Sequence, residues 1–130
     1  MADPFETEAK AWMEKAWRDL EMAQRAVAVM PPFYDMAVYH CQQSGEKAVK
    51  AFLVLRGLVF EKTHDIELLI SLAREIEPSF SKLSDAADAL TPYATRFRYP
   101  AAGSVPHIYT KGAIEYYSRA GWPVWGGGVG

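Results

Sequence analysis

The sequence has little of what several classes of protein require. Its single cysteine, Cys41, excludes an internal disulfide framework and a cysteine-rich zinc site. No stretch approaches the roughly 18 consecutive apolar residues of a membrane-spanning helix, so we expect no contact with a membrane. The acidic start, MADPFETE, also lacks the apolar segment of a secretory signal. We therefore expect a cytoplasmic protein.

The common motifs of nucleotide, hydrolase and metal sites are missing as well. The 130 residues contain no GxxxxGK[ST], no GxGxxG and no GxSxG sequence. The three histidines are isolated, and none belongs to an HExxH motif, so we expect no metal and no cofactor. The glycine-rich end, GGGVG, precedes no helix and is therefore not a phosphate-binding loop.

Charge is nearly balanced over the chain but unevenly distributed along it. Fourteen basic and sixteen acidic side chains give a formal net charge of −2, which excludes binding of nucleic acid by bulk charge. Residues 91–130, however, hold four basic side chains against one acidic, and eight of the seventeen aromatic residues. This mixture suits contact with RNA or a nucleotide, because guanidinium groups pair with phosphate and aromatic rings stack on bases. A solvated, loosely packed segment explains it equally well.

Helical periodicity dominates the chain, and no strand-like alternation persists. Residues 5–30 carry one apolar stripe at alternating three- and four-residue steps: Met13, Ala16, Leu20, Ala23, Val27 and Met30. Further helices are predicted at about 35–57, 63–77, 81–97 and, shorter, 107–119. Asp35 and Gly57 are the expected caps of the second helix. We predict an all-α fold, an antiparallel four-helix up-and-down bundle with a short fifth helix, formed by residues 1–120 and followed by a disordered tail at 121–130.

The second predicted helix carries an unusual polar stripe. His40, Gln43, Lys47 and Lys50 fall within about 80° of one another on a helix, opposite an apolar arc that includes Cys41. A solvated face is the simplest interpretation. The mixture of imidazole, amide and ammonium groups also suits an interhelical hydrogen-bond network or the lining of a groove, and makes these four residues candidates for binding a nucleotide or RNA.

A second group of candidates lies near the predicted end of the fourth helix. Arg96 and Arg98 stand where the helix dipole favours positive charge, and two arginines there also suit phosphate, with Tyr99 beside them. His107 follows nine positions after Arg98. If a loop brings the two together, His107 would act as general acid or base and Arg98 would stabilise the phosphorane during metal-independent RNA cleavage.

Four motifs, in this order and spacing, resemble the HEPN domain family. They are the residues Trp12, Ala16, Asp19, Leu20 and Ala23, the stretch HCQQSGEKAVKAFL at 40–53, KTHD at 62–65 and RYP at 98–100. The resemblance covers about residues 5–120. It implies a small helical bundle that forms homodimers and acts with a minimal nucleotidyltransferase, in modules of the toxin–antitoxin or stress-response type.

The resemblance also implies a chemistry for the C-terminal candidates. Many HEPN proteins are metal-independent endoribonucleases with an arginine and a histidine separated by about four to six residues. The histidine is often followed by x-Tyr, and the partner can attach nucleotides to that tyrosine. Arg98, His107 and Tyr109 correspond to these residues. Eight residues separate Arg98 from His107, more than in the active pattern. We therefore expect a nucleotide- or RNA-binding subunit, with an endoribonuclease toxin and a purely structural adaptor as alternatives.

Overall fold

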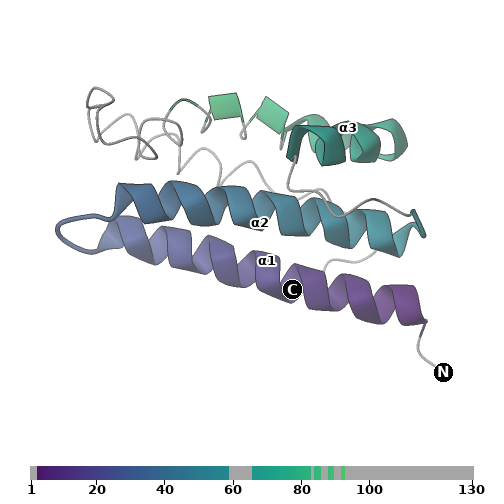
Figure 1. Ribbon diagram of the computed structural model, residues 1–130, viewed down its shortest axis with the longest axis horizontal. Coiled ribbons are helices and arrows are strands. Elements are labelled where there is room, and N and C mark those ends of the chain that lie inside the picture. The colour runs from purple at the N-terminus through teal and green to yellow at the C-terminus, as the bar shows by residue number, and fades with distance from the viewer. Residues whose placement is uncertain (1–2, 59–65, 83, 86–87, 90–91, 93–130) are drawn as a thin grey trace.

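The computed structural model describes residues 3–58, 66–82, 84–85, 88–89 and 92. In this part the chain forms helices α1 (Pro4–Ala28), α2 (Tyr34–Leu55) and α3 (Ile66–Ile76) and a short 3-10 helix, η1 (Pro78–Phe80) (Figure 1). The two long helices run antiparallel, and α3 packs against α2 (Figure 1). Residues 81–82, 84–85, 88–89 and 92 are also helical, and the described residues include no strand. The predicted all-α class is confirmed for them.

The predicted helix at 107–119 and the tail at 121–130 lie outside the described residues, and so does most of the segment 81–97. The four-helix up-and-down arrangement with a fifth helix therefore stays a prediction. Among the residues that the structure describes, no helix is both long and apolar enough to cross a membrane.

Local signals in the sequence explain where α1 begins and ends. The Asp3 carboxylate accepts a hydrogen bond from the Phe5 N–H at 2.9 Å, and Pro4 occupies the first turn, where its missing N–H costs nothing. The helix ends at Ala28, two residues before the predicted end at Met30. A proline disfavours helical geometry in the residue before it, so the chain leaves the helix ahead of Pro31. Met30 is consequently 86% exposed, and its predicted place in the apolar stripe is wrong.

Helix α2 is capped at its C-terminus as predicted. Gly57 has a positive φ of 71°, its N–H donates to the Val54 carbonyl at 2.9 Å, and the Leu58 N–H donates to the Leu53 carbonyl at 3.0 Å. This is the Schellman arrangement, which satisfies two of the last helical carbonyls. At the other end Phe33 is the N-cap and Asp35 lies in the first turn, so the predicted cap at Asp35 is wrong.

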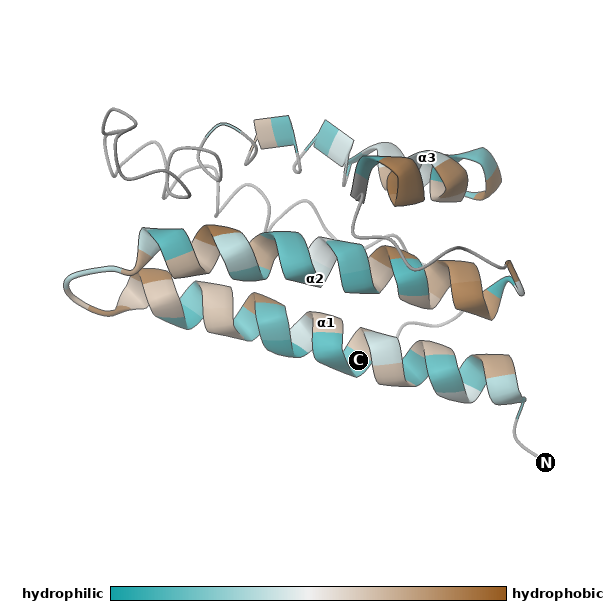
Figure 2. Cartoon of the chain, viewed as in Figure 1, coloured by the Kyte–Doolittle hydropathy of each residue, from teal (hydrophilic) through white to brown (hydrophobic). Residues whose placement is uncertain are grey.

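Small residues let α1 and α2 approach closely. Ala16, Ala23, Ala37 and Ala48 are all buried, as are the larger apolar side chains around them. Figure 2 shows the alternation of apolar and polar residues along each helix that this packing requires. Helix α3 adds Leu69, Ile70 and Ala73 to the core, and η1 adds Phe80, whose ring centre lies 4.6 Å from that of Phe52.

Replacement of Gly57 tests the α2 cap. A Cβ at this position would meet no atom of the described residues within 4 Å, so we attribute the cost of Gly57→Ala to the positive φ. We expect a loss of about 1 kcal/mol in the free energy of unfolding, measured by urea denaturation. Gly57→Asn should lose less than half as much, because asparagine tolerates this conformation better. Equal losses for the two variants would contradict this explanation.

Candidate functional site

A buried carboxylate joins the two long helices. Asp19 projects from α1 toward α2, with only 7% of its surface exposed. Its Oδ1 lies 2.8 Å from His40 Nδ1, and its Oδ2 accepts a hydrogen bond from Lys47 Nζ at 2.6 Å. His40 and Lys47 are seven residues apart, two turns of α2, and therefore point to the same side. Because an ionised carboxylate only accepts hydrogen bonds, Nδ1 of His40 is the donor.

A second polar contact fixes the same helix pair. The Ser44 hydroxyl is fully buried and donates to the Ala16 carbonyl at 2.8 Å. Ser44 lies on α2 between His40 and Lys47, and Ala16 lies one turn before Asp19 on α1. The hydroxyl and the carboxylate therefore define one register between the two helices, since a shift of either helix would leave buried polar groups without partners.

Lys50, the last member of the polar stripe, is also turned inward. Its ammonium lies 3.6 Å from the Glu46 carboxylate, and both side chains are buried. The same nitrogen lies 5.2 Å from the centre of the Trp12 ring, a cation–π distance. A carboxylate and an aromatic face together offset part of the cost of removing this charge from water.

The polar stripe is thus part of the packing between helices and not a solvated face. His40 and Lys47 form an interhelical hydrogen-bond network with Asp19, which is one of the interpretations that the sequence left open. Gln43 is half-buried. A role for these residues and Lys50 in binding a nucleotide or RNA stays a prediction.

Asp19 belongs to the family motif, but no partner for it was predicted from the sequence. Its signal is an acidic residue three positions after the core residue Ala16 and four before Ala23, on the helix face that carries the core.

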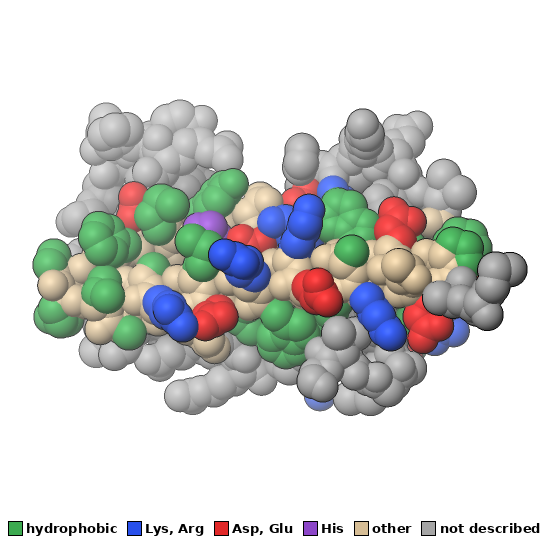
Figure 3. Space-filling view, turned by 90° about the horizontal axis from the view of Figure 1, so that it is seen from below, with side chains coloured by type: hydrophobic (Ala, Val, Ile, Leu, Met, Phe, Trp, Pro, Cys, Tyr) green, Lys and Arg blue, Asp and Glu red, His purple; other side chains and the backbone are tan. Residues whose placement is uncertain are grey.

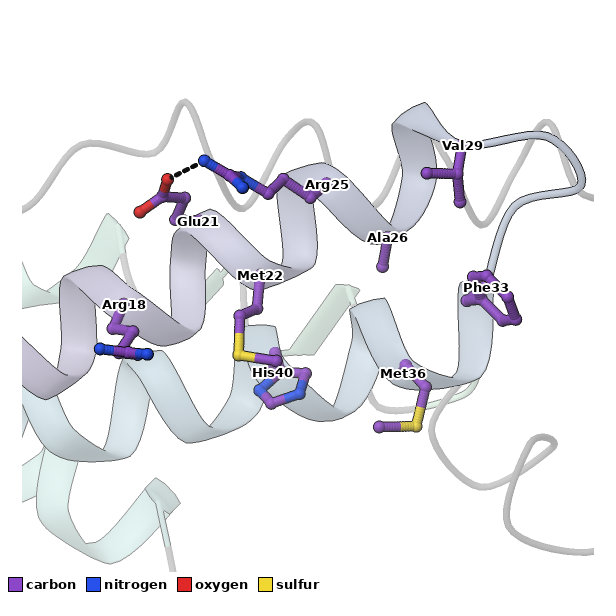
Figure 4. A pocket seen from close by; sticks show the side chains of 9 residues that line it. All are labelled: Arg18, Glu21, Met22, Arg25, Ala26, Val29, Phe33, Met36 and His40. Atoms are coloured by element: carbon purple, nitrogen blue, oxygen red, sulfur yellow. Dashed lines mark hydrogen bonds and ion pairs between the residues drawn. The ribbon is translucent and has the colours of Figure 1, made fainter.

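An open groove of about 780 Å³ lies beside this network, at the end of the helix pair that carries the α1–α2 loop. Figure 4 shows its lining from both helices: Arg18, Glu21, Met22, Arg25, Ala26, Val29, Phe33, Met36 and His40. Hydrophobic side chains also gather at this end of the molecule in Figure 3. The sequence did not predict the groove, because its lining comes from two helices whose relative rotation the apolar pattern leaves open.

The C-terminal candidates Arg96, Arg98, Tyr99, His107 and Tyr109 lie outside the described residues. The convergence of Arg98 and His107 on one cleft therefore stays a prediction. Within the described residues, no three His, Cys, Asp or Glu side chains gather to hold a metal ion.

The chain belongs to the HEPN domain family, whose model matches residues 9–119, so the predicted family is confirmed. A Methanocaldococcus jannaschii protein named a "putative toxin" is 44% identical to it over 54 residues, which cover 42% of this chain. The matched segment spans only 34% of the length of that relative. No solved structure matches the chain.

The Asp19 carboxylate should contribute measurably to stability. Asp19→Asn keeps the shape but removes the charge that His40 and Lys47 share, so we expect a loss of about 2 kcal/mol in urea denaturation. Glu21→Gln is the matched control, because its ion pair with Arg25 is largely exposed and should be worth less than about 0.5 kcal/mol. Similar losses for the two variants would contradict a special role for Asp19.

Cys41 should be chemically inert in the folded chain. It is fully buried, and this burial raises the pKa of its thiol to about 12, so almost none of the reactive thiolate is present near neutral pH. At pH 8 we expect Ellman's reagent to label the native protein at least about a hundredfold more slowly than the protein in urea. Rapid labelling of the native protein would show that the α1–α2 pair opens readily.

Proposed function

We propose that this chain is the HEPN subunit of a toxin–antitoxin or stress-response module in the cytoplasm. In this proposal it forms a homodimer, binds a nucleotide or RNA, and acts with a minimal nucleotidyltransferase. The observation that carries the proposal is the family match over residues 9–119. The relative named a toxin supports the same class of module.

The charges of α2 indicate where phosphate would bind in this proposal. Lys47 is held by the Asp19 carboxylate, and Lys50 is buried beside Glu46 and Trp12. A cation already paired with a carboxylate adds little to the neutralisation of a phosphate, which is the main source of RNA affinity. The arginines of the C-terminal segment, Arg96 and Arg98, with Tyr99 for stacking on a base, are therefore the favoured ligands.

Metal-independent RNA cleavage is the second candidate function. The name of the Methanocaldococcus relative favours it, since RNA cleavage is an activity expected of HEPN toxins. His107 would act as general acid or base, and Arg98 would stabilise the charge on the pentavalent phosphorane. Tyr109 would then be the residue that a nucleotidyltransferase modifies to silence the toxin.

An RNA assay in EDTA separates the two functions. We expect the native chain to bind single-stranded RNA at low salt without cleaving it. Cleavage that falls about 10²- to 10⁴-fold in His107→Ala, but not in the control His64→Ala, would replace the binding function by the endoribonuclease. Failure to bind or cleave RNA, together with failure to bind nucleotides, would contradict both functions.

A further inference from the structure

The groove at the loop end exposes apolar side chains that nothing in the described chain covers. Met22, Val29, Phe33 and Met36 are 46%, 45%, 56% and 46% exposed, and they line one continuous surface. Elsewhere on the same helices the apolar stripe is buried in the core. A continuous apolar surface of this kind on a small domain marks a site of interaction.

The shape of the groove favours an elongated occupant over a small molecule. Small-molecule pockets enclose roughly 70–90% of their ligand, whereas half-exposed side chains line a shallow surface. The groove follows α1 from Arg18 to Val29, about three helical turns or roughly 16 Å. Because α1 and α2 flank it, the ridges of a third helix can pack into it. Met22 and Met36 are flexible and adapt to such a partner.

The charges around the groove indicate the sign of the charge that a partner would carry. Arg25 is neutralised by Glu21, with 2.7 Å between Nη2 and Oε1 (Figure 4). Arg18, at the other end of the groove, has no ion pair or hydrogen bond with any described residue. The unmatched charge is therefore positive, and a carboxylate complements it. The same groove on a second copy of the chain presents another Arg18 and lacks this complement.

We propose that the groove binds an amphipathic helix of a partner protein, with large apolar residues on one face and an aspartate or glutamate that reaches Arg18. The apolar face would cover Met22, Phe33 and Met36, as in other complexes where a helix lies in a groove. This inference rests on the proposed module in one respect, namely that the chain acts with a protein partner.

Methionine methyl NMR of the full chain tests this binding. The probe is a synthetic amphipathic peptide of about 18 residues with leucines on one face and glutamates beside them, compared with its lysine counterpart. We expect the glutamate peptide to shift the Met22 and Met36 signals. The buried Met13 and the exposed Met30, which lies outside the groove lining, are internal controls and should not move.

Charge variants test the role of Arg18. Arg18→Gln should weaken binding of the glutamate peptide about two- to fivefold and reduce its advantage over the lysine peptide, as expected for one exposed ion pair. Lys10→Gln removes the same charge from an exposed position on α1 outside the groove and should leave the affinity unchanged.

Three results would overturn the inference. Absence of shifts at Met22 and Met36 with either peptide would show that the groove binds no such helix. Equal affinity for the two peptides would refute the acidic partner. Shifts of the same two signals when the native protein alone is concentrated would identify a second copy as the occupant. The titration contains no RNA or nucleotide, so its failure is distinguishable from a failure of the RNA assay.

Discussion

Asp19 lies on the face of α1 that packs against α2, where its carboxylate contacts both His40 and Lys47. Removing a carboxylate from water costs several kcal/mol unless it is paired and hydrogen-bonded. Only one register of the two helices gives it both partners, and the buried Ser44–Ala16 hydrogen bond requires the same register. The alanines along the interface allow close approach but would tolerate other registers. The polar contacts therefore determine how the apolar surfaces meet.

The Asp19 interaction also helps to distinguish the side chains that hold the two helices together from those that are available to a partner. Asp19 holds Lys47 against α1, and Lys50 is buried beside Glu46 and Trp12, so the most distinctive motif of the chain serves the helix pair. His40 stands at the boundary, with Nδ1 against Asp19 and its side chain in the lining of the groove (Figure 4). The groove presents apolar side chains and an arginine, Arg18, that pairs with no described residue. The C-terminal segment, which lies outside the described residues, has basic and aromatic residues in its sequence.

Much of the helical fold was predictable from the sequence, because periodicity and caps are local. The spacing of the apolar residues located α1 and α2 to within two residues, and Gly57 marked the end of α2. The prediction for Met30 was wrong because Pro31 disfavours helical geometry in the residue before it, so the helix ends early. The pairing of Asp19 with His40 and Lys47 was not predictable, since it depends on the relative rotation of two helices. The same rotation creates the groove.

In the proposed function, α2 provides the scaffold while the C-terminal arginines bind phosphate. The salt dependence of RNA affinity tests this division most directly, because the slope of log K against log salt changes by about 0.7 for each phosphate of single-stranded RNA that the protein neutralises. We expect Lys47→Met to destabilise the fold but to leave this slope unchanged, whereas Arg98→Ala should reduce its magnitude by about 0.7. A smaller slope for Lys47→Met, with Arg98→Ala like the native chain, would contradict this division of roles.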